Sequence, residues 1–222
     1  MKKIAAILVA LVFSSSAFAI DISMFNIGAS YNHGVYGGDG KELNYNQGGT
    51  VDNTTKKSAA FVDSYASVFV ELEVNDSVAI GIDYVPDAIS TPANINSGEG
   101  TKSDTDISVE ADFNDLTTVY LLAKSPIGIY GKVGFSSMEI DVSSKNAGTY
   151  ADPGTTDGTT VALGYEHDTD NGIAVRLEAA YHSFDDVAAN NGITSSGTSQ
   201  RNELSVTGME GLTGRISVVK SF

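Results

Sequence analysis

Apolar and polar residues alternate along most of the chain with a period of two. Between residues 173 and 182 every odd position is apolar, whereas the even positions include Arg176, Glu178 and His182. A period of two places neighbouring side chains on opposite faces of a β-strand. The same alternation runs through residues 25–32, 61–74, 78–86 and 159–167. We therefore expect an all-β fold whose strands have one apolar and one polar face.

Three further segments alternate less regularly. Residues 107–124 carry an apolar row that includes Phe113 on odd numbers, so Glu110 and Asp112 share the opposite, polar face. Residues 127–142 form another segment, and the last one ends the chain at Phe222. With the five regular segments, this predicts eight strands.

The apolar row changes phase within residues 127–142. It occupies odd numbers as far as Phe135 and even numbers from Met138 to Val142. A shift of one residue moves every side chain to the other face unless a β-bulge absorbs it. The pattern predicts a bulge at Ser136 and Ser137, with the apolar row facing outward on both sides of it.

Short and long connections alternate between these segments. The short ones are residues 75–77, 125–126 and 170–172, and the long ones, rich in Gly, Asn, Thr, Ser and Asp, are residues 37–58, 87–105, 143–158 and 186–200. This rhythm predicts an up-and-down antiparallel sheet with turns at one end and loops at the other. Nine residues tilted by about 40° rise roughly 23 Å, close to the ~25 Å apolar band of outer-membrane barrels.

The N-terminus has the form of a secretory signal. Two lysines precede an apolar run of about ten residues, and Ala17-Phe18-Ala19 is a small-x-small cleavage pattern. We expect residues 1–19 to be a cleaved signal peptide and residues 20–222 to form one barrel domain. No later segment is as long as the roughly 20 apolar residues of a spanning helix, so entry into a membrane would use strands.

Composition excludes several classes of protein. The chain has no Cys, which excludes disulfides, thiolate metal sites and a cysteine nucleophile. Its formal net charge is −15, which argues against nucleic acid as a partner.

Residues 161–181, VALGYEHDTDNGIAVRLEAAY, resemble the penultimate hairpin of a known group of proteins. With the signal, the alternating strands and the terminal Phe222, the mature chain resembles Gram-negative outer-membrane β-barrel proteins of the small OmpA/OmpX-type porin-like families. The resemblance implies a closed antiparallel up-and-down transmembrane barrel of eight strands in the cell outer membrane, with short periplasmic turns and long extracellular loops. It also implies contact with outer-membrane lipid and lipopolysaccharide, and with the barrel-assembly machinery through the strand that ends at Phe222.

Aromatic residues on the apolar rows lie near the predicted strand ends. They are Phe25, Tyr31, Tyr84, Phe135, Tyr181 and Phe222. Amphipathic rings favour the head-group level of a bilayer, so they are interpreted as membrane-interface girdles. The alternative is the ordinary core row of a soluble β-barrel.

Charged residues on the opposite rows are expected to face the barrel interior. The central ones are Glu71, Asp83, Lys132, Glu166, Arg176, Glu178 and Arg215. Asp63, Glu73, Glu110 and Asp112 join them by parity, which leaves eight acids against three bases. Because an unpaired charge in a narrow interior is costly, Glu71, Glu166 and Glu178 are expected to surround the three bases. The alternatives to a structural polar core are a cation-selective conduit and divalent-cation binding near Asp63 and Asp112.

Motifs of enzymes and cofactor sites fail on inspection. Neither His-Glu-x-x-His nor Gly-x-Ser-x-Gly occurs, and the glycine-rich segment 37–41 lacks the first glycine and the Ser/Thr of a phosphate loop. His182 and Ser183 are adjacent in a strand and so point to opposite faces. His33 and His167 are expected to lie far apart. No catalytic residue, metal site or cofactor is predicted, and the protein is not expected to be an enzyme.

Three hypotheses follow for function. The first is an outer-membrane barrel with a structural or surface-interaction role and a polar, acidic, closed lumen. The second is a narrow cation-preferring channel, favoured if the interior acids exceed what the bases can pair. The third is a soluble periplasmic ligand-binding β-barrel, whose apolar faces would point inward.

Overall fold

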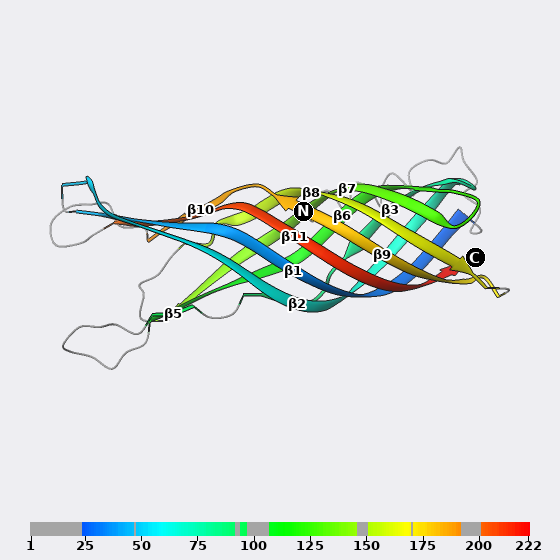
Figure 1. Cartoon of the computed structure of the whole chain (residues 1–222), viewed down its shortest axis with the longest axis horizontal. Coiled ribbons are helices and arrows are strands. Elements are labelled where there is room, and N and C mark those ends of the chain that lie inside the picture. The colour runs from blue at the N-terminus through cyan, green and yellow to red at the C-terminus, as the bar shows by residue number, and fades with distance from the viewer. Residues whose placement is uncertain are drawn as a thin grey trace, which may run out of the picture.

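The structure, a computed structural model, describes residues 24–46, 48–91, 94–96, 107–145, 151–169, 171–191 and 201–222. The predicted signal peptide lies outside these residues. Eight strands of the described chain form an antiparallel ring in the order β1-β2-β3-β6-β7-β8-β9-β11, and β1 pairs with β11 to close it (Figure 1). Their bounds are β1 Phe25–Tyr45, β2 Val51–Asn75, β3 Val78–Tyr84, β6 Ile107–Lys124, β7 Ile129–Lys145, β8 Gly154–Asp168, β9 Ile173–Phe184 and β11 Asn202–Ser221. The predicted up-and-down barrel is confirmed.

Three short strands extend this ring. β4 (Ile89–Ser90) and β5 (Asn94–Asn96) pair with β6 beyond the end of β3, and β10 (Val187–Asn190) pairs with β11 beyond the end of β9. β4 and β5 therefore extend the position of β3 beside β6, and β10 extends the position of β9 beside β11, so the ring still has eight strand positions.

The two ends of the barrel differ, as the connection lengths predict. The β2–β3, β6–β7 and β8–β9 turns lie at one end with the start of β1 and the end of β11, at the right of Figure 1. We call this the turn end and the opposite one the loop end. Within the described residues, no helix is long and apolar enough to span a bilayer.

The predicted loop over residues 37–58 is wrong in its extent. β1 continues to Tyr45 and β2 begins at Val51, so most of this hydrophilic segment is a paired ribbon. Every side chain from Val51 to Ala60 is exposed. Backbone pairing needs no apolar face, so polarity alone did not distinguish a ribbon in water from a loop. Residues 87–105, 143–158 and 186–200 likewise contain β4 and β5, the start of β8, and β10.

The predicted parity of the regular segments holds through the barrel. Along β1, β8 and β9 the even-numbered side chains lie on the inner face and most odd-numbered ones are exposed. Along β2 and β3 the odd-numbered side chains lie on the inner face. Glycines on the inner face make room for rings. A Cβ on Gly164 would lie 2.3 Å from Cζ of Tyr130, and one on Gly81 would lie 2.3 Å from Cζ of Tyr120.

The predicted bulge at Ser136 and Ser137 is wrong. The register of β7 with β8 is regular there, and Met138, Ile140 and Val142 continue the inward row of Tyr130 and Lys132. The irregularity lies opposite, in β6, between Asn114 and Thr117, where Asp115 has a φ of 54°. The apolar row changes phase because the interior itself becomes apolar toward the loop end.

The bulge reverses the orientation of the first half of β6. Phe113 packs against the inner apolar cluster, and the Asp112 carboxylate accepts an exposed hydrogen bond from the Ser90 hydroxyl at 2.5 Å. Glu110 shares the parity of Asp112. The prediction that these two acids face the interior is therefore wrong.

Candidate functional site

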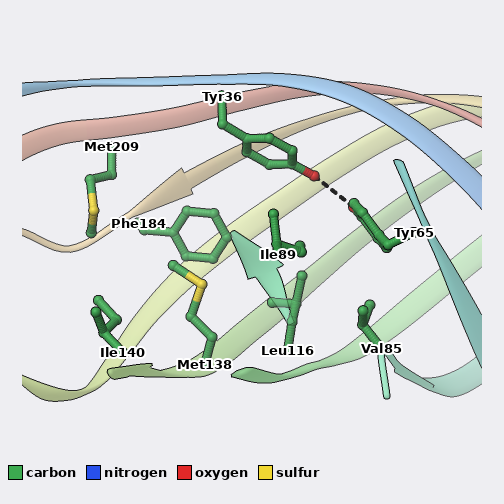
Figure 2. Close-up of a cluster of buried hydrophobic side chains, with 9 residues drawn as sticks. All are labelled: Tyr36, Tyr65, Val85, Ile89, Leu116, Met138, Ile140, Phe184 and Met209. Carbon is green, nitrogen blue, oxygen red and sulfur yellow. Dashed lines mark hydrogen bonds between the residues drawn. The ribbon is translucent and has the colours of Figure 1, made fainter. Parts of the chain in front are cut away.

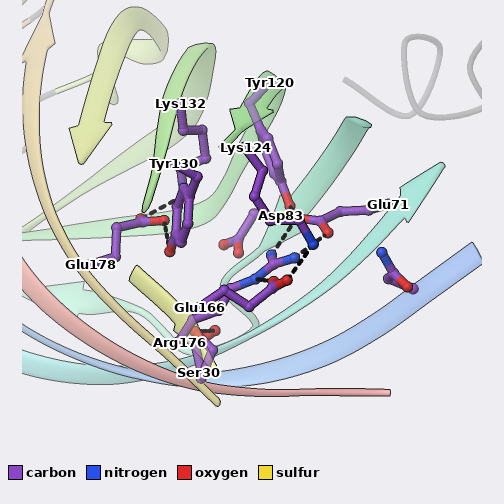
Figure 3. Close-up of polar contacts among 12 residues, drawn as sticks. Ser30, Glu71, Asp83, Tyr120, Lys124, Tyr130, Lys132, Glu166, Arg176 and Glu178 are labelled. Carbon is purple, nitrogen blue, oxygen red and sulfur yellow. Dashed lines mark hydrogen bonds and ion pairs between the residues drawn. The ribbon is translucent and has the colours of Figure 1, made fainter. Parts of the chain in front are cut away.

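The turn half of the interior is crossed by ion pairs centred on Arg176 of β9. Its Nη1 and Nη2 donate to the two carboxylate oxygens of Glu71 on β2 at 2.6 and 2.8 Å, and its Nε donates to Glu166 on β8 (Figure 3). Glu71 also accepts from the Tyr120 hydroxyl at 2.8 Å, and Glu166 from Lys124 Nζ at 2.5 Å. Glu71 is only 1 % exposed. A bidentate guanidinium–carboxylate pair satisfies both groups at that burial.

Two more ion pairs adjoin this cluster. Glu178 accepts from Lys132 Nζ at 2.6 Å and from the Tyr130 hydroxyl at 3.0 Å. Arg215 of β11 donates through Nη2 to Asp83 of β3, and its Nε donates to Ser30 Oγ at 2.8 Å.

Aromatic rings join the ion pairs into one network. The Phe69 ring contacts the Arg176 guanidinium at 5.5 Å and the Arg215 guanidinium at 5.1 Å from its centroid. Lys132 Nζ lies 4.9 Å from the Tyr120 centroid. We call the four acids and four bases of these pairs the charge network: Glu71, Asp83, Glu166, Glu178, Lys124, Lys132, Arg176 and Arg215.

The formal charges of this network cancel. The structure brings all seven predicted interior residues into it and adds Lys124, which the sequence interpretation omitted. The signal for Lys124 was present, because it shares even parity with Tyr120 opposite the outward row of β6. With Glu110 and Asp112 outside, the expected excess of five interior acids is not found. Asp63 and Glu73 remain half-buried at the margins, where Glu73 accepts from Asn26 Nδ2 at 2.9 Å.

A chain of hydroxyl groups and one histidine lies next to the network on its loop side. It links Thr118, Ser136, Thr160, His182 and Thr213 through successive hydrogen bonds of 2.8 to 3.0 Å. His182 uses both ring nitrogens in this chain and stacks on Phe184. It therefore has a structural role between two strands.

An apolar cluster fills the loop half of the barrel. Figure 2 shows its buried side chains: Tyr36, Tyr65, Val85, Ile89, Leu116, Met138, Ile140, Phe184 and Met209. The hydroxyls of Tyr36 and Tyr65 satisfy each other at 2.6 Å. A cavity of about 20 Å³ separates the cluster from the charge network, and this space is of the order of one water molecule. The expected polar interior is thus polar only in its turn half.

The six predicted interface aromatics occupy the outward rows. Tyr31, Tyr84, Phe135 and Tyr181 are exposed toward the loop end, with Phe135 76 % exposed, whereas Phe25 and Phe222 lie at the turn end. Tyr165, exposed on β8 near the turn end, belongs to the same outer surface and was missed. Their place at a membrane interface stays a prediction.

One histidine–serine pair meets on the outer face. His33 Nδ1 lies 2.7 Å from Ser64 Oγ, because the two residues are opposite each other on β1 and β2. Within the described chain, no ion pair or hydrogen bond joins His33 to a carboxylate, and the Ser64 N–H already donates to Asp63 Oδ1 at 2.7 Å. The pair therefore lacks the orienting acid and the oxyanion donors of a serine hydrolase.

A metal site has no support in this geometry. The described residues contain no group of three or more His, Asp or Glu side chains arranged to hold an ion. Asp63, one of the candidates for a divalent cation, instead accepts from the backbone N–H groups of Ser64 and Ser90.

Comparisons with known proteins agree with this architecture. The family model for the outer membrane protein β-barrel domain matches residues 5–201. No curated protein sequence matches the chain.

Among solved structures, Neisserial surface protein A is 12 % identical with a TM-score of 0.44, over 89 % of this chain and 97 % of that one. OprG from Pseudomonas aeruginosa is 12 % identical with a TM-score of 0.49, over 86 % and 95 %. The outer membrane protease OmpT from Escherichia coli is 10 % identical with a TM-score of 0.40, over 94 % and 99 %. At this similarity the family assignment depends on the family model.

Proposed function

Because this chain belongs to the outer membrane β-barrel family, we propose that it is a non-conducting barrel of the outer membrane with a structural or surface-interaction role. In this proposal the short turns face the periplasm, and the extended strands at the loop end project from the cell. Residues 1–19 are removed as a signal peptide, and the strand ending at Phe222 is read by the assembly machinery. Lipid and lipopolysaccharide surround the outward rows.

The observation that carries the proposal is the charge balance of the network. Each of its four carboxylates has a basic partner, so little uncompensated negative charge remains to attract cations. The apolar cluster lies in series with it and occupies the loop half of the interior with buried apolar side chains. Eight strands enclose only enough space for side chains, which also supports a closed lumen. The hypothesis of a narrow cation channel depended on an excess of interior acids, and the charge network has none.

A surface role is supported by the ribbon formed by β1 and β2. From Val51 to Ala60 both faces of β2 are exposed, which leaves them available to a partner outside the membrane. A catalytic role has no comparable support, because the His33–Ser64 pair lacks an acid and His182 is engaged by two threonines.

Planar-bilayer conductance tests this proposal. The purified protein is refolded in detergent, its folding is verified by the gel shift between boiled and unboiled samples, and it is then added to the bilayer. We expect no conductance steps from the folded protein. Cation-selective steps from the same preparation would overturn the proposal.

A paired variant makes a negative result informative. Replacing both Met138 and Phe184 by Ala removes two large side chains from the apolar cluster. Arg176→Ala removes the central base of the charge network. We expect conductance steps only from the protein that carries all three substitutions. The matched control carries Leu163→Ala and Val133→Ala on the outer face, and it should remain silent.

A further inference from the structure

The cavity of about 20 Å³ between the charge network and the apolar cluster has a mostly polar wall. Asp83 and Glu178 contribute carboxylates to this wall, and Lys132 and Arg215 contribute bases. A water molecule needs roughly 10–15 Å³ of such space and two to four polar partners. The cavity is therefore large enough for one water molecule and polar enough to hold it. We call it the central cavity.

The charges in the wall favour a neutral ligand. Asp83 is paired with Arg215, and Glu178 is paired with Lys132. A cation in the central cavity would approach both bases, and an anion would approach both carboxylates. Either ion would also have to lose its hydration shell. A neutral molecule that can both donate and accept hydrogen bonds avoids these costs, and the volume limits it to the size of water.

Both ends of the chain of hydroxyl groups lie in the wall of the central cavity. This hydroxyl chain consists of Thr118, Ser136, Thr160, His182 and Thr213, and it begins on β6 and ends on β11. Its four hydroxyls and the one N–H of a neutral imidazole supply five protons for its four hydrogen bonds. One proton must therefore be donated outside the chain. If the hydrogen bonds run in one direction, the donor is the hydroxyl at one end, Thr118 or Thr213.

An acceptor for that proton lies beside Thr118. Asp83 and Thr118 are opposite each other on β3 and β6, and both line the central cavity. Among the described residues, the hydrogen bonds that Asp83 accepts from Ser67 and Arg215 both end on Oδ2. The other oxygen, Oδ1, therefore keeps acceptor capacity.

The second carboxylate in the wall is more fully engaged. Glu178 accepts from Lys132 on Oε1 and from the Tyr130 hydroxyl on Oε2. Asp83 is thus the better acceptor for a further donor in the central cavity. The hydroxyl chain should end at Thr118 rather than at Thr213.

We propose that the central cavity binds one water molecule, which accepts from the Thr118 hydroxyl and donates to Oδ1 of Asp83. The hydrogen bonds then run from Thr213 through His182 to Thr118. His182 accepts from Thr213 on Nε2 and carries its proton on Nδ1, so the water sets the tautomer of a histidine that lies three strands away from Thr118. The site is internal, and it holds or fails independently of any surface role.

Nitrogen-15 NMR of the refolded protein in lipid nanodiscs, labelled on histidine, tests the tautomer. The protonated and unprotonated nitrogens of a neutral imidazole have well-separated chemical shifts. The chain has three histidines, and His33→Gln and His167→Gln assign the signals of His182 by elimination. Near neutral pH we expect the proton of His182 on Nδ1. A proton on Nε2 would overturn the proposal.

A high-resolution crystal structure of the refolded protein tests the water directly. We expect one ordered water molecule within hydrogen-bond distance of Thr118 Oγ1 and Asp83 Oδ1. A central cavity without density at that position would overturn the proposal. This measurement and the tautomer of the unmodified protein decide the outcome even if a variant fails to fold.

Two substitutions at opposite ends of the hydroxyl chain separate its two possible directions. Thr118→Val removes the donor to the water, so the chain should reverse and the His182 proton should move from Nδ1 to Nε2 in most molecules. Thr213→Val removes only a donor to His182, and the proton should stay on Nδ1. If Thr118→Val left the proton on Nδ1, the water would not set the tautomer and the proposal would fail.

Matched controls test whether a change of tautomer comes from the lost hydroxyl. Thr118→Ser keeps the hydroxyl and should keep the His182 proton on Nδ1. Thr156→Val makes the same change as Thr118→Val at a buried threonine outside the hydroxyl chain, and it should also leave the tautomer unchanged. Every variant is first shown to fold by the boiled and unboiled gel shift. A shift of the proton to Nε2 in either control would contradict the assignment to the Thr118 hydroxyl.

Discussion

Arg176 binds both carboxylate oxygens of Glu71, although 105 residues separate the two in the chain. Arg176 is on β9 and Glu71 on β2, and β11 and β1 lie between these strands in the ring. The pair therefore ties together strands that share no backbone hydrogen bonds. Asp83 and Arg215 do the same between β3 and β11. The charge network thus acts as an internal brace for the closed sheet.

Removing the Arg176 side chain should strongly destabilise the folded barrel. Arg176→Ala leaves Glu71 and Glu166 buried with fewer partners, and we expect a loss of about 3–5 kcal/mol in the free energy of unfolding. Urea unfolding in lipid vesicles measures it. Arg201→Ala is the control, because the Arg201 and Glu203 side chains are 43 and 30 % exposed and a pair in contact with water should contribute at most about 1 kcal/mol. The double variant Glu71→Leu with Arg176→Met should recover part of this stability, because it leaves no unpaired charge at these two positions. A loss below about 1 kcal/mol for Arg176→Ala would contradict the role of the charge network as a brace.

Gly164 should not tolerate a methyl group. In Gly164→Ala the new Cβ collides with the Tyr130 ring and with Leu177 O at 2.8 Å, which displaces the hydroxyl that binds Glu178. We expect a destabilisation of about 1–3 kcal/mol. Gly131→Ala serves as the comparison, because its nearest neighbour would be 3.9 Å away, and should change unfolding little. Equal effects of the two changes would argue against the packing of Tyr130 over Gly164.

The inward phase of Met138 can be tested by truncation. Met138→Ala removes apolar contacts in the cluster and should cost about 2–5 kcal/mol. The neighbouring Glu139 is exposed, and Glu139→Ala should be nearly neutral. Unfolding in vesicles distinguishes the two. If Met138→Ala proved neutral, the apolar row would have to face lipid after a bulge at Ser136.

A charged residue midway along the outer face of the barrel should destabilise the protein in lipid. Leu163 is 65 % exposed on β8, and Leu163→Arg should destabilise the protein in lipid by about 2–4 kcal/mol if this surface lies in hydrocarbon. Thr155→Arg, exposed nearer the loop end, should cost about 0–1 kcal/mol. A protein that tolerated both changes, and stayed monodisperse without detergent, would instead be a soluble barrel.

Much of the fold could be predicted because strand parity is a local property. In β9 the side chains of Arg176 and Glu178 must share a face, and opposite-face residues such as Leu177 must share the other, whatever the rest of the chain does. Paired with the rhythm of turns, this predicted the ring of eight strands and the inward position of seven charged residues.

What parity could not decide is which environment each face meets along its length. Met138 and Ile140 were expected to face outward because the interior was assumed to be polar throughout, and the structure places them in an inner apolar cluster. The compensating bulge lies at Asp115 on the neighbouring strand, where the irregular row in the sequence showed a break but not its direction.

The sequence by itself determined the strands, their two faces and the order in which short and long connections follow one another, because these depend on residues close in the chain. Only the tertiary structure decided the partners of the charges and the extent of the strands at the loop end. Closing the ring brings Glu71 to Arg176 and joins β1 to β11, and those contacts depend on register across the whole barrel, which no local pattern contains.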